Sequence, residues 1–262
     1  MSEHAKSRRG IQSIEVGGQL LNVLVEQATP MTLGDLARLG GMPASKAHPY
    51  LVSFCNLGIV EQDPVTGHYG LGPFAIQMGL VSLQQLSPVR LAIPEITKLA
   101  DATNQTVALA VWGTHGPTVT YIVESNYPVH IAMRAGSVMS ILGTATGLAF
   151  AAYMPPKLIQ KLIEHELGDS LVLGQTKTPI SQKTLEAKLN EVRSRKLARV
   201  QNQPIPGINA FSAPVFNHMH AMVLAITVTG ASTTFDSDWE GSIATKLKAC
   251  ANRLSHVLGY TS

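Results

Sequence analysis

The sequence has no apolar run long enough to cross a membrane, and it contains only two cysteines among 262 residues. A membrane-spanning helix needs about 20 consecutive apolar residues, whereas the best candidate, "AMVLAITVTG", has the length of a strand. The opening stretch "MSEHAKSRRG" lacks the apolar core of a signal peptide. Cys55 and Cys250 each fall among apolar residues of a predicted helix, which indicates two buried thiols in a reducing compartment. These absences predict a cytoplasmic protein without a membrane segment.

Motifs of common enzyme classes are also missing. We find no G-x-S-x-G, no P-loop and no G-x-G-x-x-G between a strand and a helix. His218 and His220 could present two imidazoles on one face of a strand, with His115 or His130 nearby. The surrounding "FNHMHA", however, reads as a hairpin turn between two strands. We therefore predict no catalytic site, no metal site and no cofactor.

Charge is scarce, at 14% of residues, and apolar residues make up 45%, which is typical of a globular chain. The net charge of +3 weakly favours an anionic partner. Residues 1–86, however, carry five basic and six acidic side chains, so the positive excess lies in the remainder. Bulk charge is thus no reason to assign DNA binding to the first part of the chain.

The N-terminal part reads as three helices followed by a hairpin. Apolar spacing predicts a helix from Ser13, a plausible N-cap, to Gln27, and Thr32 caps a short second helix, "LGDLARL". A third helix opens with Pro43 and ends at Gly58. Two short strands, "GIVEQD" and "HYGLG", flank the turn "PVTG". This order is typical of a winged helix-turn-helix.

The remainder predicts an α+β domain with an antiparallel sheet flanked by helices. A connecting helix runs from Pro73 to about Leu86, and Pro88 starts another. The expected domains are residues 1–72 (winged helix-turn-helix), 73–87 (linker helix) and 88–262 (sheet domain). Further helices are expected at about 144–153, 156–167, 181–195 and 237–258. The predicted strands are "QTVALAVW", "PTVTYIVES", "VHIAMRAG", "LARVQNQ", "INAFSAPVF" and "AMVLAITVTG".

Three segments together resemble the IclR family of bacterial transcriptional regulators over nearly the whole chain. They are "TLGDLARLGGMPASKAHPYLVSFCNLGIVEQDPVTGHYGLGP", "RAGSVMSILGTATGLAFAA", and "GINAFSAPVF" followed by "AITVTG". The resemblance implies an N-terminal winged helix-turn-helix and a C-terminal GAF-like effector-binding domain. It also implies homodimers paired through the N-terminal domains, often assembled into homotetramers.

The resulting expectation is a DNA-binding transcriptional regulator, and not an enzyme. Its partners would be double-stranded operator DNA and a small effector, an organic acid. The alternative is a cytoplasmic small-molecule sensor or scaffold with a GAF-like domain and no specific DNA binding. The weakly acidic first 86 residues are the main argument for that alternative.

The third helix would supply most DNA contacts. Helical spacing turns one stripe inward, including Ala47 and Leu51, and leaves Pro49 facing outward. In the family a long basic residue commonly stands at that position. With Ser45 as N-cap, Pro49 would be the fourth helical residue and would forfeit one hydrogen bond. Pro49 then either contacts a thymine methyl, re-aims the helix, or is tolerated without any contact. The candidate DNA-binding residues are Arg8, Arg9, Ser45, Lys46, His48, Pro49, Ser53 and His68.

The effector site is expected around a helix start and one strand. Thr144 and Thr146 precede an apolar helix, and either could cap it; unpaired N–H groups there, without a crowding acid, favour an anion. Thr227 and Thr229 face the same side of a strand, and "RVQNQPIPG" holds no acid where family members often have one. Plain core packing and sheet propensity are the alternatives. By the resemblance, the candidate effector-binding residues are Ile131, Met139, Ala145, Thr146, Ile208, Ala210, Thr227 and Thr229.

Overall fold

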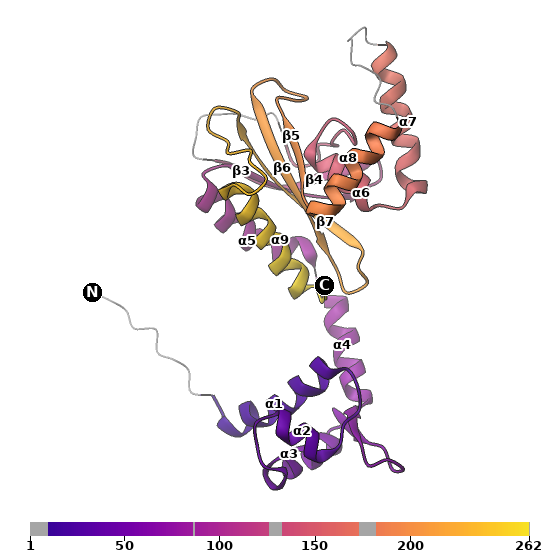
Figure 1. The fold of residues 1–262 in the computed structure, drawn as a ribbon, viewed down its shortest axis with the longest axis vertical. Helices are drawn as coiled ribbons and strands as arrows, with labels where there is room; N and C mark the ends of the chain where they lie inside the picture. Colours follow the sequence, from indigo (N-terminus) through magenta and orange to yellow (C-terminus); the bar gives the residue numbers. More distant parts are fainter. Residues whose placement is uncertain (1–9, 86, 126–132, 173–181, 262) are drawn as a thin grey trace, which may run out of the picture. The chain divides into compact units, whose positions relative to one another are not determined.

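A computed structural model describes residues 10–85, 87–125, 133–172 and 182–261 of the chain (Figure 1). The chain divides into two compact units, Met1–Leu86 and Ser87–Ser262, here called the N-terminal and C-terminal units. Within the described ranges, no helix has both the length and the apolar character needed to span a bilayer.

The N-terminal unit has the helix order and the hairpin that the sequence predicts. Its buried core joins the first three helices through side chains such as Leu20, Leu36 and Leu51, and Tyr69 adds the hairpin to this core. The two short strands pair antiparallel. This arrangement is a winged helix-turn-helix. The elements are α1 (Gln12–Gln27), α2 (Leu33–Leu39), α3 (Ala44–Asn56), β1 (Val60–Gln62), β2 (Tyr69–Leu71) and α4 (Pro73–Gln85).

Two helix starts in this unit differ in how they are capped. The Thr32 hydroxyl oxygen accepts a hydrogen bond from the Asp35 N–H at 3.2 Å, so the predicted cap of α2 is confirmed. The Thr32 hydroxyl also donates to the Asp35 carboxylate, and together with Arg38 it lowers the pKa of Asp35. Helix α1 begins after Ile11 without a side-chain cap, so the expected cap at Ser13 is wrong. The reason is that the Ile11 carbonyl already accepts from the Ile14 and Glu15 N–H groups.

The C-terminal unit is built on a five-stranded antiparallel sheet with strand order β4-β3-β7-β6-β5. Helices α5 and α9 cover one face, and α6 packs on β6 and β7 from the other face. The sequence-predicted class, α+β, is confirmed. The elements are α5 (Pro88–Thr103), β3 (Thr106–Gly113), β4 (Gly116–Val123), α6 (Ala145–Tyr153), α7 (Pro156–Val172), α8 (Gln182–Arg195), β5 (Ala198–Gln201), β6 (Ile208–Phe216), β7 (Met222–Ala231) and α9 (Ser242–Val257).

One predicted strand, "VHIAMRAG", is not a strand in its described part. Residues 129–132 lie outside the described residues, and Met133–Gly136 lead into a turn. The chain instead pairs with the edge of β4 slightly later, where the Met139 N–H donates to the Pro117 carbonyl at 2.7 Å. The positive φ of 91° at Gly136 explains why the extended run stops before this pairing.

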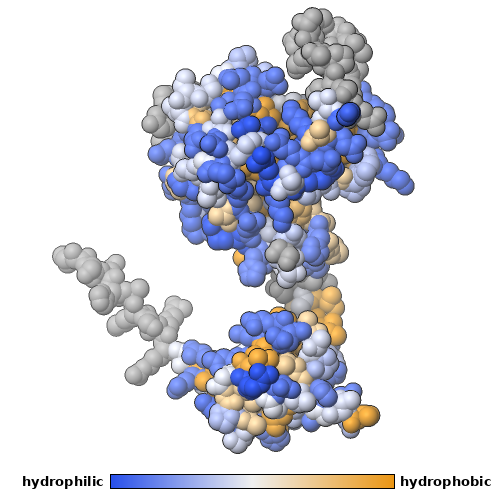
Figure 2. Space-filling model, viewed as in Figure 1, coloured by the Kyte–Doolittle hydropathy of each residue, from blue (hydrophilic) through white to orange (hydrophobic). Residues whose placement is uncertain are grey.

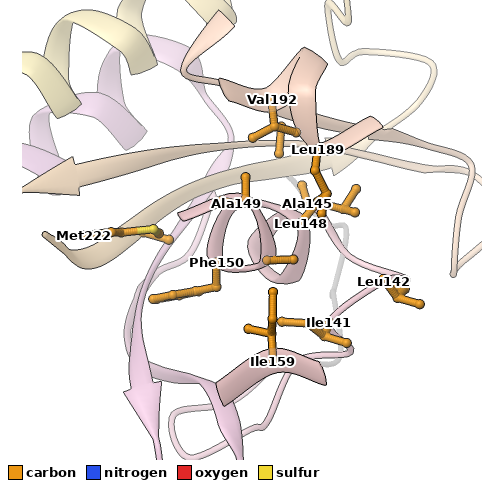
Figure 3. Packing of buried hydrophobic residues seen from close by; sticks show 14 of the residues in the cluster. Ile141, Leu142, Ala145, Leu148, Ala149, Phe150, Ile159, Leu189, Val192 and Met222 are labelled. Carbon is orange, nitrogen blue, oxygen red and sulfur yellow. The ribbon is translucent and has the colours of Figure 1, made fainter. Parts of the chain in front are cut away.

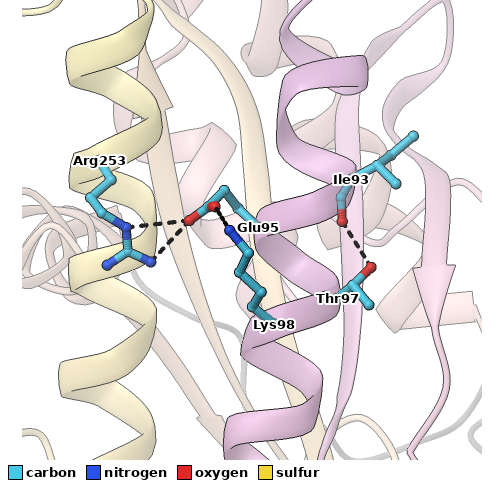
Figure 4. A network of polar contacts seen from close by, with 5 residues as sticks. All are labelled: Ile93, Glu95, Thr97, Lys98 and Arg253. Atoms are coloured by element: carbon cyan, nitrogen blue, oxygen red, sulfur yellow. Dashed lines mark hydrogen bonds and ion pairs between the residues drawn. The ribbon is translucent and has the colours of Figure 1, made fainter. Parts of the chain in front are cut away.

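The helical layer of α5 and α9 is tied together by a charged cluster (Figure 4). The Glu95 carboxylate of α5 accepts from Lys98 at 2.7 Å and from Arg253 of α9 at 3.1 Å. These hydrogen bonds lower the pKa of Glu95. Cys250, on the buried side of α9, belongs to this layer, and burial raises the pKa of its thiol to about 11, so it is an unreactive core thiol at neutral pH. Cys55, in contrast, is only partly buried, so the expectation of two buried thiols holds for Cys250 alone.

Helix α6 is buried along its length, from Ala145 to Ala152. Figure 3 shows Leu189 and Val192 of α8 on one side of this helix and Ile159 of α7 on another. A helix that is apolar all round requires such cover on every side. The start of α6 is therefore held between the sheet and the segment that precedes it.

Candidate DNA-binding surface and effector site

Helix α3 opens at Pro43, as the sequence predicts. Its N-cap is Pro43, whose carbonyl accepts from the Lys46 and Ala47 N–H groups at 3.0 Å each. The expected cap at Ser45 is wrong, because the first turn already closes on residue 43. Pro49 is therefore the sixth helical residue, and the Ser45 carbonyl receives no hydrogen bond from it.

The predicted faces of α3 are confirmed. Ala47 and Leu51 are fully buried. The outward set (Ser45, Lys46, His48, Pro49 and Ser53) is exposed. Four of these five side chains carry no internal hydrogen bond or ion pair with the described residues, whereas the Ser53 hydroxyl donates to the Pro49 carbonyl at 3.0 Å. An exposed helix face with a cation and an imidazole is suited to the major groove of DNA.

The wing presents a different chemistry. The Asp63 carboxylate accepts from the Thr66 N–H at 2.8 Å and the Val65 N–H at 2.7 Å, which shapes the turn and lowers the pKa of Asp63. Gly67 completes the turn with a φ of 71°. Val65 is 91% exposed at the tip, whereas His68 is only partly exposed at the base. His68 therefore lies beside the wing tip and not on it. Arg8 and Arg9 lie outside the described residues.

Thr144, and not Thr146, caps helix α6. The Thr144 oxygen accepts from the Gly147 N–H at 2.9 Å, and its hydroxyl donates to the Ser140 carbonyl at 2.8 Å. The next two backbone N–H groups, of Ala145 and Thr146, donate to none of the described residues. Each of these two residues is only 2% exposed. A buried helix start with unpaired N–H groups is a site that favours an anion.

Three buried hydroxyls form a chain next to this helix start. The oxygens of Thr146 and Thr227 lie 2.7 Å apart, and Thr227 donates to Ser212 on β6 at 2.9 Å. Thr229 is also buried and donates to the Asn209 carbonyl at 3.2 Å. Ser212 was missed from the sequence. Strand alternation from Ala210 would have placed it on the same face as Ala210.

The structure brings some of the candidate effector residues together and places others apart from them. Ala210 pairs with Thr229, directly beside the hydroxyl chain. Ile208 lies two residues earlier on β6, partly exposed. Met139 pairs with the outer edge of β4, two strands away from β7 in the sheet order. Ile131 lies outside the described residues.

Small side chains flank the buried hydroxyls within the sheet. Thr227 pairs with Ala108 on one side and with Ser212 on the other. One cavity among the described residues lies elsewhere, as an open groove of about 900 Å³ along α8, lined by residues such as Lys188, Glu191 and Arg195.

An acid does lie close to the start of α6, contrary to expectation. The Glu166 carboxylate of α7 accepts from the Ile141 N–H at 2.6 Å, the Leu142 N–H at 3.0 Å and the Ser140 hydroxyl at 2.8 Å. The sequence carried no signal for this contact, because Glu166 follows Ser140 by 26 residues on a separate helix. The Glu166 carboxylate thus binds the residues that precede the cap. The N–H groups of Ala145 and Thr146 have no partner among the described residues.

A winged helix-turn-helix with an exposed recognition-helix face, in one chain with a separate sheet domain, defines the class of DNA-binding transcriptional regulators. Two family models match the chain: the IclR helix-turn-helix domain over residues 13–64 and the bacterial transcriptional regulator IclR C-terminal domain over residues 81–256. The chain belongs to the IclR family of bacterial transcriptional regulators.

Individual relatives agree with this assignment. The crystal structure of Pseudomonas aeruginosa HmgR is 33% identical, covers 96% of this chain and 100% of its own, and superposes with a TM-score of 0.88. The HTH-type transcriptional regulator XynR of Escherichia coli is 24% identical over 250 residues, which cover 95% of this chain and 98% of the relative. The transcriptional repressor IclR of Escherichia coli is 24% identical over 87% of this chain and 83% of its own length.

The protein is therefore a DNA-binding transcriptional regulator and not an enzyme. The alternative of a sensor or scaffold without specific DNA binding is wrong, because the helix-turn-helix model of the family matches the first unit. In the part of the chain that the structure describes, no three metal-binding side chains come together.

Proposed function

We propose that α3 binds operator DNA and that a small carboxylate-bearing metabolite controls this binding from the C-terminal unit. The observation that carries the proposal is the pair of buried, unpaired N–H groups of Ala145 and Thr146 at the start of α6. A carboxylate placed there would accept from both groups and meet the positive end of the helix dipole. The hydroxyls of Thr227 and Thr229, on the strand that faces α6, would then contact the rest of the effector.

Two experiments test this function. In a thermal-shift screen of small carboxylic acids with the full chain, an acid present at 100 times its dissociation constant should add about 2.7 kcal/mol to the free energy of unfolding. The same acid should change the affinity for DNA from the protein's own promoter region, measured at fixed salt. Stabilisation by an acid without any change in DNA affinity would contradict effector control.

We further propose a cytoplasmic homodimer paired through the N-terminal unit. Helix α4 exposes Phe74, Ile76 and Leu80, which are 43%, 63% and 56% accessible, and Figure 2 shows hydrophobic surface along this helix. Ile14, near the N-terminal end of α1, is a separate exposed apolar side chain, at 68%. A row of exposed apolar side chains along one helix, as on α4, marks protein contacts. Sedimentation of the full chain, and of a variant with Ile76→Glu, tests this pairing.

Removing single hydroxyls from the effector site should weaken the effector response and leave operator binding intact. Thr146→Val breaks the 2.7 Å contact with Thr227, and Thr229→Val removes the bond to the Asn209 carbonyl. Each change should cost about 1 kcal/mol of stability. The matched control is Thr103→Val, which removes a 2.7 Å bond to the Leu99 carbonyl on α5. The test is to titrate all three variants with the effector and to compare their affinities for it. If both Thr146→Val and Thr229→Val bind the effector as tightly as the wild type, these two residues do not belong to the effector site.

Replacing Pro49 by alanine should stabilise the N-terminal unit and reduce base discrimination. Alanine restores an N–H that can donate to the Ser45 carbonyl, so we expect a gain of about 1–3 kcal/mol. If the exposed ring meets a thymine methyl, discrimination at one base pair falls by about 1 kcal/mol. Pro94→Ala in α5 is the control, since Pro94 is also exposed inside a helix. Affinities for operator and for single-base variants of it are compared at one salt concentration. Unchanged discrimination would show that Pro49 makes no base contact.

A further inference from the structure

Glu166 connects α7 to the helix start at the proposed effector site. Its two carboxylate oxygens accept three hydrogen bonds from the segment that enters α6, two of them from the backbone of Ile141 and Leu142. Bonds to a carboxylate are stronger than bonds between neutral groups. Glu166 is only partly exposed, so solvent replaces these bonds poorly.

The segment that Glu166 holds is also the segment that carries the cap of α6. The Ser140 hydroxyl donates to Glu166, and its oxygen accepts from the Gly143 N–H at 2.8 Å. The Ser140 carbonyl accepts from the Thr144 hydroxyl, and the Thr144 oxygen in turn caps α6. A continuous series of hydrogen bonds therefore runs from Glu166 to the first turn of α6.

This first turn contains the groups that the proposed effector site needs. Ala145 and Thr146 follow Thr144 directly, and the Thr146 oxygen lies 2.7 Å from that of Thr227 on β7. Gly147 keeps the turn close to the held segment, because a side chain there would overlap the backbone of Ser140 and Ile141. A shift of the segment would thus move Thr146 relative to Thr227.

We propose that Glu166 is a positioning residue of the effector site, which holds the N–H groups of Ala145 and Thr146 and the Thr146 hydroxyl in register with Thr227. This inference rests on the proposed function. The addition is that α7 influences effector binding indirectly. Glu166 contacts residues 140–142, and these residues position the N–H groups of Ala145 and Thr146. Glu166 would also set the local charge, since its carboxylate contacts the segment directly before the helix start and would disfavour effectors with more than one negative charge.

The test uses Glu166→Gln in the full chain. Glutamine has one acceptor oxygen where glutamate has two, so the three bonds cannot all persist. The matched control is Glu164→Gln, because Glu164 is exposed on the same helix and, among the described residues, its carboxylate accepts from Gln160 alone, at 2.9 Å. Benzoate and succinate serve as the monocarboxylate and dicarboxylate probes. Methyl resonances of isotope-labelled threonines report the positions of Thr146 and Thr227.

We expect Glu166→Gln to shift the methyl signals of Thr146 and Thr227 and to weaken benzoate binding by about three- to tenfold, which lies within the roughly two- to thirtyfold range for changes outside the ligand contacts. Succinate binding should weaken less than benzoate binding, because a repulsive charge is removed together with the brace. Glu164→Gln should leave the signals and both affinities at their wild-type values.

Three results would overturn the proposal. The first is that the threonine methyl signals of Glu166→Gln match those of the wild type. The second is that these signals shift while the benzoate affinity stays at the wild-type value, which would make the contact purely structural. The third is that Glu164→Gln loses as much benzoate affinity as Glu166→Gln. If Glu166→Gln does not fold, Ser140→Ala takes its place, since it removes the hydroxyl bond to Glu166, together with the acceptor of the Gly143 N–H, and keeps the two backbone bonds to the carboxylate. If neither probe stabilises the wild-type protein, the carboxylate effector itself loses support, and the threonine signals alone decide the role of Glu166.

Discussion

Replacing Gly147 by alanine should destabilise the C-terminal unit by about 3 kcal/mol and abolish the effector response. An added methyl group would lie 2.6 Å from the Ile141 Cα and 2.7 Å from its carbonyl carbon, and closer still to the Ser140 carbonyl oxygen. These are backbone atoms, and the segment that contains them is held by Glu166, so no flexible side chain can give way. Helix α6 would have to move away from it, although it is buried on every side.

Tryptophan fluorescence during chemical denaturation measures this change selectively, because Trp112 and Trp239 are the only tryptophans and both belong to the C-terminal unit. Gly18→Ala in α1 is the control. Apart from the backbone of α1 itself, no atom of the described residues lies within 4 Å of a methyl group added there, so alanine should stabilise the N-terminal unit by up to about 1 kcal/mol. A Gly147→Ala protein with the wild-type fluorescence transition would show that the start of α6 relaxes freely.

Replacing Leu51 by alanine should strongly destabilise the N-terminal unit and weaken operator binding. Leu51 is fully buried where α3 meets the core of this unit, and truncation of such a side chain costs about 2–5 kcal/mol. Small domains have total stabilities of only about 5–15 kcal/mol. The unit is therefore expected to lose much of its stability, while the tryptophan transition of the C-terminal unit stays unchanged.

Val52→Ala is the matched control, since Val52 is the next residue of the same helix and is 42% exposed. It should leave both stability and operator affinity nearly unchanged. Circular dichroism follows the helices of both units, whereas tryptophan fluorescence follows the C-terminal unit alone. A transition at low denaturant that only circular dichroism detects in the Leu51→Ala protein would show that the N-terminal unit unfolds first. Operator binding at wild-type strength by Leu51→Ala would mean that α3 does not depend on this core.

Much of the fold followed from patterns within short stretches of chain. Apolar residues at i, i+3, i+4 and i+7 predicted which face of α3 is buried, with Ala47 and Leu51 inward and Pro49 outward. The residue type of Thr32 predicted the cap of α2. The strands β3, β6 and β7 were predicted from alternation and β-branched residues. These features could be predicted because each depends on neighbours within a few residues, whose backbone geometry is the same in most proteins.

Helix starts were harder to predict than helix faces. Both Pro43 and Ser45 are acceptable at the start of α3, and only the hydrogen bonds to the Pro43 carbonyl decide between them. Likewise Thr144 and Thr146 were equivalent in sequence, and the structure assigns the cap to Thr144 because its oxygen reaches the Gly147 N–H. A cap depends on the backbone conformation of a single residue, which periodicity does not specify.

By itself the sequence determined the α+β class, the inward and outward faces of α3, the likeness to one family of regulators, and that Thr227 and Thr229 share one side of a strand. Only the tertiary structure decided that Thr146 meets Thr227, a residue 81 positions later, that Ser212 joins them, and that Glu166 braces the segment before α6. The physical reason is the range of the forces involved. Backbone and periodicity preferences act over a few residues, whereas the partner of a buried hydroxyl or N–H group is set by how distant elements pack.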